Sequence, residues 1–320
     1  MLFSKLFELE SERGNMGKGK TILITGAGGF TGRHACDFFH KQGYQVYALM
    51  RNQPILSLPY NIIICDLLSL EQIEEAVNVS KPDYILHLAG RCSVTDSWEH
   101  PVDVLSVNTM ATAKLIDEAR KHVKHCRILI PGSALEFEPN QIETLKNPYS
   151  LSKTIQVILA KSWIQLFESQ VILAKPTNLI GPGNSTGICA ILGQRIAEIE
   201  AMHSHDKEEA IEIAVNATRD FLDVRDAIKA YELLLRKGKV GEVYEICSET
   251  SYTLLEVMAI YKSLTNENIH FEEVEELRPS YVASMSAQRL RELGWVRDYT
   301  LKESLNDVLT HFRNKIKKDV

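Results

Sequence analysis

Short apolar runs alternate with helix-length amphipathic segments through the first half of the chain, and this alternation restricts the possible fold more than any other feature. The runs are almost entirely apolar, which is typical of parallel strands covered on both faces. The expected strands are TILIT (21–25), YQVYALM (44–50), NIIICD (61–66), YILHLA (84–89), RILIPGS (127–133) and QVILAKPTNLIGPG (170–183). Strands alternating with helices predict an α/β fold, with a Rossmann-like doubly wound parallel sheet and right-handed crossovers.

After Gly181 the pattern is less regular. It predicts a helix over 187–201, a solvated loop over 203–210 and a strand over 211–215. The segment 219–238 is expected to open with a polar stretch and then form a helix that ends at a glycine. The basic C-terminal stretch from Arg313 is expected to be a frayed tail.

These expectations define a domain organisation. Residues 1–18 are interpreted as an N-terminal extension. Residues 19–176 are predicted to form a dinucleotide-binding Rossmann domain, to which part of 211–247 returns. Residues 177–320 are predicted to form mainly a smaller α/β substrate-binding lobe.

Composition and charge limit the possible partners. The formal net charge of −6 argues against generic nucleic-acid binding. No apolar run approaches the roughly 20 residues of a membrane span, and the first residues lack the apolar core of a signal peptide. The six cysteines are scattered without metal-binding spacing, which favours reduced thiols in a cytoplasmic protein and no metal site.

A glycine-rich loop stands between the first expected strand and the helix that follows it. In TILITGAGGFTGRHA, Gly26, Gly29 and Gly32 are placed so that the backbone can turn tightly and approach a pyrophosphate. The phosphates would lie at the helix N-terminus, beside Phe30 and Thr31. The loop therefore predicts dinucleotide binding.

The end of the second strand distinguishes between the two nicotinamide dinucleotides. An acid there would bind the ribose 2′-hydroxyl of NAD, but this strand ends at Met50 and is followed by Arg51. Arg33 follows the last glycine of the loop. Because guanidinium groups suit a 2′-phosphate, NADP(H) is favoured over NAD.

The stretch NPYSLSK places Tyr149 and Lys153 one helical turn apart, directly after Pro148. An ammonium group close to a phenol favours the phenolate, so Lys153 is expected to lower the pKa of Tyr149. Such a tyrosine could transfer protons near neutral pH. Y-x-x-x-K also occurs by chance at ordinary helix starts, so the assignment of Tyr149 and Lys153 as a catalytic pair depends on the remaining motifs.

With the glycine loop and YSLSK in one chain, the sequence resembles the extended short-chain dehydrogenase/reductase family of the NAD-dependent epimerase/dehydratase type, from Gly19 to about Trp295. The segment PGSALEF matches the family motif that carries a catalytic hydroxyl. The resemblance therefore implies Ser133, Tyr149 and Lys153 as catalytic residues. It further implies cofactor contacts from Asp66, Leu67, Leu88, Ala89, Gly90, Asn108, Tyr149, Lys153 and Pro176.

Three later segments resemble nucleotide-sugar enzymes, and the stretches DSWEHPVDVLSVNTMATAKLIDEAR and GQRIAEIEA resemble in particular GDP-4-keto-6-deoxymannose reductases and related 4-ketoreductases. KPTNLIGPG places Asn178 near the substrate, while RDFLDVRDAIKAY and ELRPS supply Arg219 and Arg278 for a diphosphate. With Ser133, these residues imply a nucleotide-diphosphate sugar as substrate. The family also implies a homodimer formed through the helix of Tyr149.

The resemblance leaves alternatives open. The main expectation is NADPH-dependent reduction of the C4 keto group of a nucleotide-linked 4-keto-6-deoxy sugar. A 4,6-dehydratase is disfavoured, because Ala134 and Leu135 occupy the positions of its catalytic acids, and Glu136 is expected to point elsewhere. A 4-epimerase with tightly bound NAD is the first alternative, and a non-catalytic NADP-binding sensor or scaffold is the second.

Overall fold

The computed structural model describes residues 17–55, 57–201, 211–214, 218–267, 269–274 and 284–319. The chain divides into two compact units. One comprises the chain up to Lys175 together with Tyr231–Tyr244, and the other comprises Pro176–Ala230 and the chain from Glu245. The predicted loop at 203–210 and nearly all of the predicted N-terminal extension lie outside the described residues.

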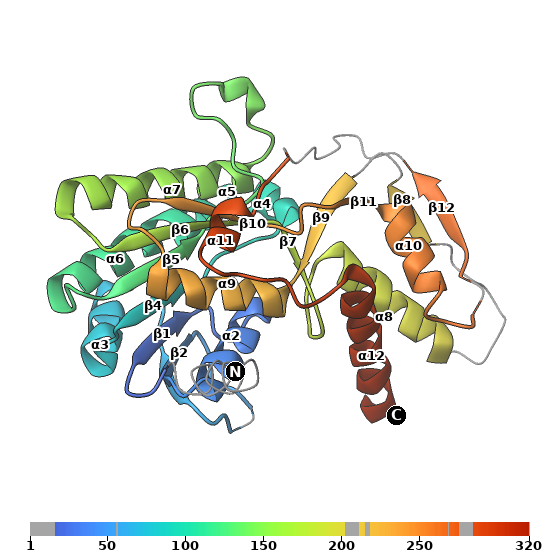
Figure 1. Cartoon of the computed structure of the whole chain (residues 1–320), viewed down its shortest axis with the longest axis horizontal. Helices are drawn as coiled ribbons and strands as arrows, with labels where there is room; N and C mark the ends of the chain where they lie inside the picture. The colour runs from blue at the N-terminus through green and yellow to red at the C-terminus, as the bar shows by residue number, and fades with distance from the viewer. Residues whose placement is uncertain are drawn as a thin grey trace, which may run out of the picture. The chain divides into compact units, whose positions relative to one another are not determined.

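A seven-stranded sheet in the order β10-β6-β5-β4-β1-β2-β3 forms the centre of the first unit (Figure 1). The strands from β3 to β6 in this order run parallel to their neighbours. Their bounds are β1 Thr21–Thr25, β2 Gln45–Met50, β3 Asn61–Ile64, β4 Tyr84–His87, β5 Arg127–Pro131, β6 Val171–Pro176 and β10 Val243–Ile246. The predicted Rossmann-like α/β fold is confirmed.

Both faces of this sheet are buried, which explains why its strands are almost entirely apolar. On β1, Leu23 packs in a cluster with residues from three helices, whereas Ile22 and Ile24 face the other way and are also fully buried. The three helices are α3 (Leu70–Ser80), α6 (Ala111–His122) and α7 (Pro148–Phe167). The first unit also contains α2 (Phe30–Lys41), α4 (Val94–Glu99), α5 (Pro101–Leu105), a π-helical turn η1 (Ser106–Met110) and a 3₁₀ turn η2 (Ile142–Thr144).

The second unit has its own small sheets and its own core. Strands β11 (Ser251–Thr253), β9 (Thr218–Asp223) and β7 (Asn178–Ile180) form one sheet, and β12 (Phe271–Val274) pairs with β8 (Ile211–Ala214). Its other elements are α8 (Ile188–Ala201), α10 (Leu254–Lys262), α11 (Gln288–Glu292) and α12 (Leu301–Asp319), and α9 (Val224–Lys237) passes from this unit to the first.

One strand in this region was not predicted, and one sequence expectation was wrong. The polar opening at 219–223 is most of strand β9, which the sequence did not reveal. The expected tail from Arg313 is the end of helix α12, because Leu305, Leu309 and Phe312 lie on one helical face and are buried in the core of the unit.

No helix in the parts of the chain that the structure describes is both long enough and apolar enough to cross a membrane.

Candidate active site

The strand order places the candidate site at the carboxyl ends of the central strands of the seven-stranded sheet. Chain connections run in opposite directions on either side of the β1–β4 pair, so the loops that follow these two strands diverge. In doubly wound sheets, ligands bind in the crevice that opens at this point, outside the carboxyl ends of the strands. The glycine loop follows β1, and Leu88 to Arg91 follow β4.

The glycine loop fits a dinucleotide phosphate because two of its glycines leave no room for a side chain. Gly26 has φ +66°, and a Cβ on it would lie 2.7 Å from the backbone nitrogen of Ala89. A Cβ on Gly32 would overlap the carbonyl oxygen of Gly26. Helix α2 begins directly after Gly29, which offers no side-chain cap, so the first N–H groups of the helix are suited to an anion.

The residues expected to select the cofactor lie around this loop. Arg33 is exposed in the first turn of α2, and its Nε donates to the carbonyl oxygen of Gly28 at 3.1 Å. Arg51 is exposed directly after β2. Asp66 follows β3, where its carboxylate accepts the N–H of Leu68 at 2.9 Å and so shapes the loop.

The loop after β4 is held from two sides. The backbone N–H of Ala89 donates to the Thr25 hydroxyl at 3.1 Å. The Asn108 side chain accepts the Arg91 N–H at 2.8 Å and donates to the Arg91 carbonyl at 3.0 Å. Asn108 is fully buried in η1, and it also donates to the Ser152 hydroxyl at 2.9 Å. Asn108 therefore joins this loop to α7.

Helix α7 begins as the sequence predicts. The Asn147 side chain accepts the N–H of Ser150 at 2.8 Å, and Pro148 occupies the first helical position. Tyr149 and Lys153 follow in the first turns and are both buried, with exposed fractions of 9% and 8%.

The pKa of Tyr149 is raised to about 12, so the prediction that it is lowered is wrong. Burial is the main cause, because the phenolate would lose its hydration, and a hydrogen bond with the Ser133 side chain lowers the pKa only in part. Tyr149 is therefore a protonated phenol at neutral pH.

Lys153 is held by two acceptors. Its ammonium donates to the Pro131 carbonyl at 2.6 Å and to Gln156 Oε1 at 2.5 Å. Burial lowers the pKa of Lys153 to about 8, although the carboxylate of Glu136 opposes this shift. The side chain therefore remains mostly charged at neutral pH.

Ser133 lies just beyond the carboxyl end of β5, and the side chain of Glu136 supports it. Glu136 Oε1 accepts the Ser133 N–H at 2.7 Å. A Cβ on Gly132 would lie 2.0 Å from Glu136 Oε1, so any larger residue there would displace this carboxylate. Glu136 was expected to point elsewhere, but its carboxylate lies directly on the backbone of Ser133.

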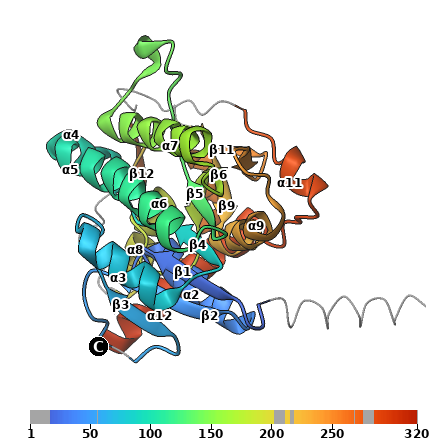
Figure 2. The same ribbon diagram turned by 90° about the vertical axis from the view of Figure 1, so that its left-hand side faces the viewer.

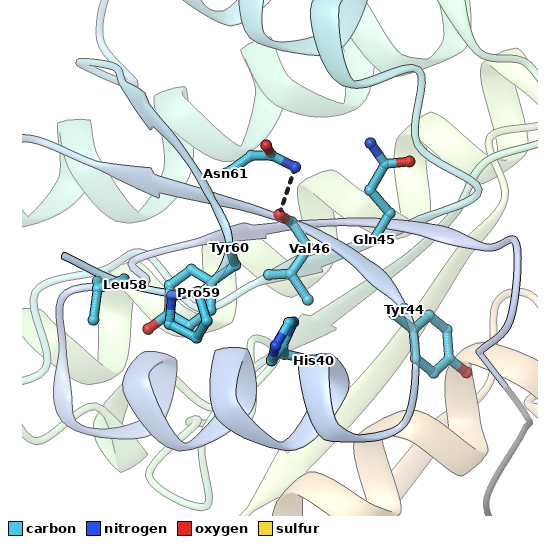
Figure 3. A pocket seen from close by; sticks show the side chains of 8 residues that line it. All are labelled: His40, Tyr44, Gln45, Val46, Leu58, Pro59, Tyr60 and Asn61. Atoms are coloured by element: carbon cyan, nitrogen blue, oxygen red, sulfur yellow. Dashed lines mark hydrogen bonds between the residues drawn. The ribbon is translucent and has the colours of Figure 1, made fainter.

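Two other features of the first unit lie away from this site. A cleft of about 450 Å³ lies beside the amino ends of β2 and β3, whereas the glycine loop follows the carboxyl end of β1. Figure 3 shows the side chains that line this cleft. It is lined by His40, Tyr44, Gln45, Val46, Leu58, Pro59, Tyr60 and Asn61. On α6, His122 Nε2 lies 3.2 Å from Glu118 and 3.6 Å from Glu74, whereas His125 and Cys126 do not belong to this group.

The residues expected to bind the substrate's nucleotide lie in the second unit. Asn178 begins β7, and its side chain donates to the carbonyl of Asp220 at 2.9 Å. In the register of β7 with β9, Asn178 lies opposite Phe221, two residues from Arg219. Pro176, an expected cofactor contact, ends β6. Arg278 lies outside the described residues.

A model of the NAD-dependent epimerase/dehydratase family matches residues 22–247, which include the glycine loop, Ser133, Tyr149 and Lys153. The chain belongs to this family. Membership in the NAD-dependent epimerase/dehydratase family confirms the resemblance found in the sequence and supports a nicotinamide dinucleotide as cofactor.

Relatives within the epimerase/dehydratase family differ in the reaction that their names state. The GDP-6-deoxy-D-mannose reductase of Pseudomonas aeruginosa is 24% identical over 93% of this chain and 99% of its own. A solved structure described as RMD from the same organism complexed with NADPH has a TM-score of 0.77 and 25% identity, covering 94% of this chain and 99% of its own. The UDP-glucose 4-epimerase of Thermus thermophilus, in complex with NAD, has a TM-score of 0.79 and 19% identity, covering 92% and 99%.

Proposed function

We propose that this chain is an NADPH-dependent reductase of the C4 keto group of a nucleotide-linked 4-keto-6-deoxy sugar. The observation that carries this proposal is the buried pair of Tyr149 and Lys153, one helical turn apart on α7, with the Ser133 side chain hydrogen-bonded to Tyr149. A reductase must donate a proton to the C4 oxygen, and we assign this role to the phenol of Tyr149. The choice of a reductase over an epimerase is supported by Arg33, by Arg51 and by the absence of an acid at the end of β2.

In the proposed reaction, Ser133 and Tyr149 hydrogen-bond the C4 carbonyl oxygen of the sugar. NADPH, when bound, supplies a hydride to C4. Tyr149 gives its phenolic proton to the C4 oxygen, which becomes a hydroxyl group. The Lys153 ammonium stabilises the phenolate that Tyr149 leaves and binds the nicotinamide ribose. The burial of both side chains keeps competing water from the proton transfer.

The cofactor choice is supported by the residues around the glycine loop. Gly26 and Gly32 leave space for a diphosphate, and Arg33 and Arg51 are exposed in the positions expected to face a 2′-phosphate. The relative whose structure contains NADPH covers nearly the whole chain.

The substrate choice rests on the second unit and on the loop after β5. We propose that Asn178, Arg219 and Arg278 bind the nucleotide diphosphate, so that the lobe within 177–320 mainly binds substrate. Because alanine and leucine follow Ser133, the chain lacks the acids that a 4,6-dehydratase uses there. We also propose a homodimer formed through α7.

The experiment is to measure loss of NADPH absorbance with 4-keto-6-deoxy sugars linked to GDP, UDP or TDP, and to repeat it with NADH. Oxidation with one of these sugars, faster with NADPH than with NADH, is the expected result. Tightly bound NAD released on denaturation, with no oxidation of NADPH, would instead identify a 4-epimerase.

A further inference from the structure

A chain of buried hydrogen bonds runs from the end of β1 to Lys153. The Thr25 hydroxyl lies 2.8 Å from His87 Nδ1, and His87 Nε2 lies 2.9 Å from the Thr112 hydroxyl. Gln156 Nε2 donates to the same Thr112 oxygen at 2.7 Å, and Gln156 Oε1 accepts from Lys153. All five side chains are at most 8% exposed, so each depends on the others for its hydrogen bonds.

In the first half of this series of hydrogen bonds, from Thr25 to Thr112, the neighbouring groups determine which atom donates. The Thr25 oxygen accepts the N–H of Ala89, so the hydroxyl proton of Thr25 can be donated to His87 Nδ1. Burial lowers the pKa of His87 to about 3, so the ring is neutral and carries one proton. Because the Thr112 hydroxyl donates to the Asn108 carbonyl, we assign the ring proton to Nε2, which then donates to the Thr112 oxygen.

The second half of this series of hydrogen bonds, from Thr112 to Lys153, determines the orientation of the Gln156 amide. Thr112 donates its own proton to the backbone carbonyl of Asn108 at 2.7 Å. Because this single proton is already used, every further partner of the Thr112 oxygen must be a donor. Gln156 therefore presents its NH₂ group to Thr112 and its oxygen to Lys153. A flipped amide would place two acceptors together and two donors together.

This orientation determines where the Lys153 ammonium can act. Two of its three N–H bonds are used by Pro131 and Gln156 Oε1. The third is left for a further partner, and Lys153 lies one helical turn from Tyr149 on α7. With an acceptor missing, the buried ammonium would be less stable and could turn away from that partner.

We propose that Gln156 is a positioning residue, whose amide oxygen, oriented through Thr112 and His87, holds the Lys153 ammonium charged and directed toward the nicotinamide ribose and Tyr149. This inference rests on the proposed function for the role of Lys153 in the cofactor site. It adds to that function a residue that does not itself touch the substrate.

The titratable groups that face Lys153 come from three elements. Glu136 on the loop after β5 and Cys92 on the loop after β4 both raise the pKa of Lys153, and Lys153 in turn lowers the pKa of His87 on β4. Tyr149 stays protonated over the range in which Lys153 titrates. A change at Gln156 should therefore appear as a shift in the titration of Lys153.

The test measures the NADPH dissociation constant by fluorescence between about pH 6 and about pH 9.5, a range that spans the titration of a lysine with a depressed pKa. The variants are Gln156→Met, which removes the acceptor, and Gln156→Glu, which replaces it with a carboxylate. Gln165→Met is the matched control, because Gln165 is an exposed residue of the same helix.

We expect NADPH binding by the wild-type protein to weaken as the pH rises through a midpoint of about 8, where Lys153 loses its proton. Gln156→Met should move this midpoint to lower pH by about one unit, which weakens binding by up to about tenfold at fixed pH. Gln156→Glu should move it to higher pH, and Gln165→Met should not move it. Equal weakening by both Gln156 variants with an unmoved midpoint would overturn the proposal.

A second pair of variants covers the case in which Gln156→Met does not fold. Thr112→Val removes the oxygen that orients the amide and should lower the midpoint, whereas Thr112→Ser keeps that oxygen and should preserve it. The readout also separates the two proposals. Shifted midpoints in a protein that reduces no sugar nucleotide would overturn the proposed function alone, and sugar reduction with coincident midpoints would overturn this inference alone.

Discussion

The Glu136 carboxylate accepts the backbone N–H of Ser133 at 2.7 Å and closes the loop that presents the serine hydroxyl. The carboxylate occupies the space that the absent side chain of Gly132 leaves. Burial raises the pKa of Glu136, because its carboxylate is poorly hydrated in the folded chain. The hydrogen bond with the Ser133 backbone opposes this effect only in part.

Replacing Glu136 should therefore separate the effect of its hydrogen bond from that of its charge. Glu136→Gln keeps an acceptor for Ser133 and should leave the free energy of unfolding at pH 7 unchanged or higher. Glu136→Ala leaves the Ser133 N–H without a partner and should lower the free energy of unfolding by about 1–3 kcal/mol. Urea unfolding of both variants measures this difference, and equal losses would show that the hydrogen bond is unimportant.

The charge of Glu136 should also make stability depend on pH. Because its pKa is raised in the folded state, the folded chain retains a proton that the unfolded chain has already released. This stabilisation is complete below the ordinary pKa and is lost as the pH rises through the raised value. The stability of wild type relative to Glu136→Gln should therefore fall as the pH rises from about 4.5 through the raised pKa. A constant difference over this range would contradict the assignment.

Gly26→Ala should destabilise the first unit. Alanine at φ +66° costs about 1–2 kcal/mol, and its Cβ would lie 2.7 Å from the backbone nitrogen of Ala89. Gly28→Ala is the matched control, because a Cβ there meets no atom within 4 Å. In chemical unfolding, we expect the free energy of unfolding to fall by more than about 2 kcal/mol for Gly26→Ala and by less than about 0.5 kcal/mol for Gly28→Ala. Similar losses at both positions would contradict the described loop geometry.

Replacing Arg33 and Arg51 with serine should weaken the binding of NADPH more than that of NADH. If the two guanidinium groups bind the 2′-phosphate, the double variant should lose about tenfold or more in NADPH affinity, since each charge-assisted hydrogen bond contributes about 1.5–3 kcal/mol. NADH lacks this phosphate and serves as the control in the same titration. A parallel loss for both dinucleotides would assign the arginines a different role.

The apolar surface of α7 should mediate self-association. Helices α5 and α6 lie alongside α7, and the side chains of Ile158 on α7 and Val102 on α5 are 45% and 72% exposed (Figure 2). A charge at Ile158 would make the burial of such a face unfavourable. Ile158→Glu should therefore elute as a monomer in light-scattering chromatography while wild type elutes as a dimer. A monomeric wild-type protein would contradict the proposed dimer.

The sequence predicted the parts of this structure that depend on local pattern. Six of the seven strands of the first sheet were predicted, because burial of both faces makes them almost entirely apolar, but β10 was not predicted. The start of α7 was predicted from the position of Pro148. Strand β9 was missed, since polar residues at its start hide the apolar ones that follow.

The parts that depend on distant contacts could not be predicted. The effect of Lys153 on Tyr149 was inferred from spacing, but the loss of hydration on burial is larger and depends on how the whole unit packs. In the same way, Thr25, His87, Thr112 and Gln156 come from four separate elements, and no spacing in the sequence relates them.

The most direct test of the proposed reaction uses NADPH carrying deuterium at the transferred position of C4. With the 4-keto-6-deoxy sugar nucleotide that supports oxidation, one deuterium should appear at C4 of the released sugar for each NADP formed. Tyr149→Phe should bind NADPH almost normally but transfer no deuterium, because it has no proton to give to the C4 oxygen. Interconversion of C4 epimers without net oxidation of NADPH, or normal transfer by Tyr149→Phe, would contradict the account.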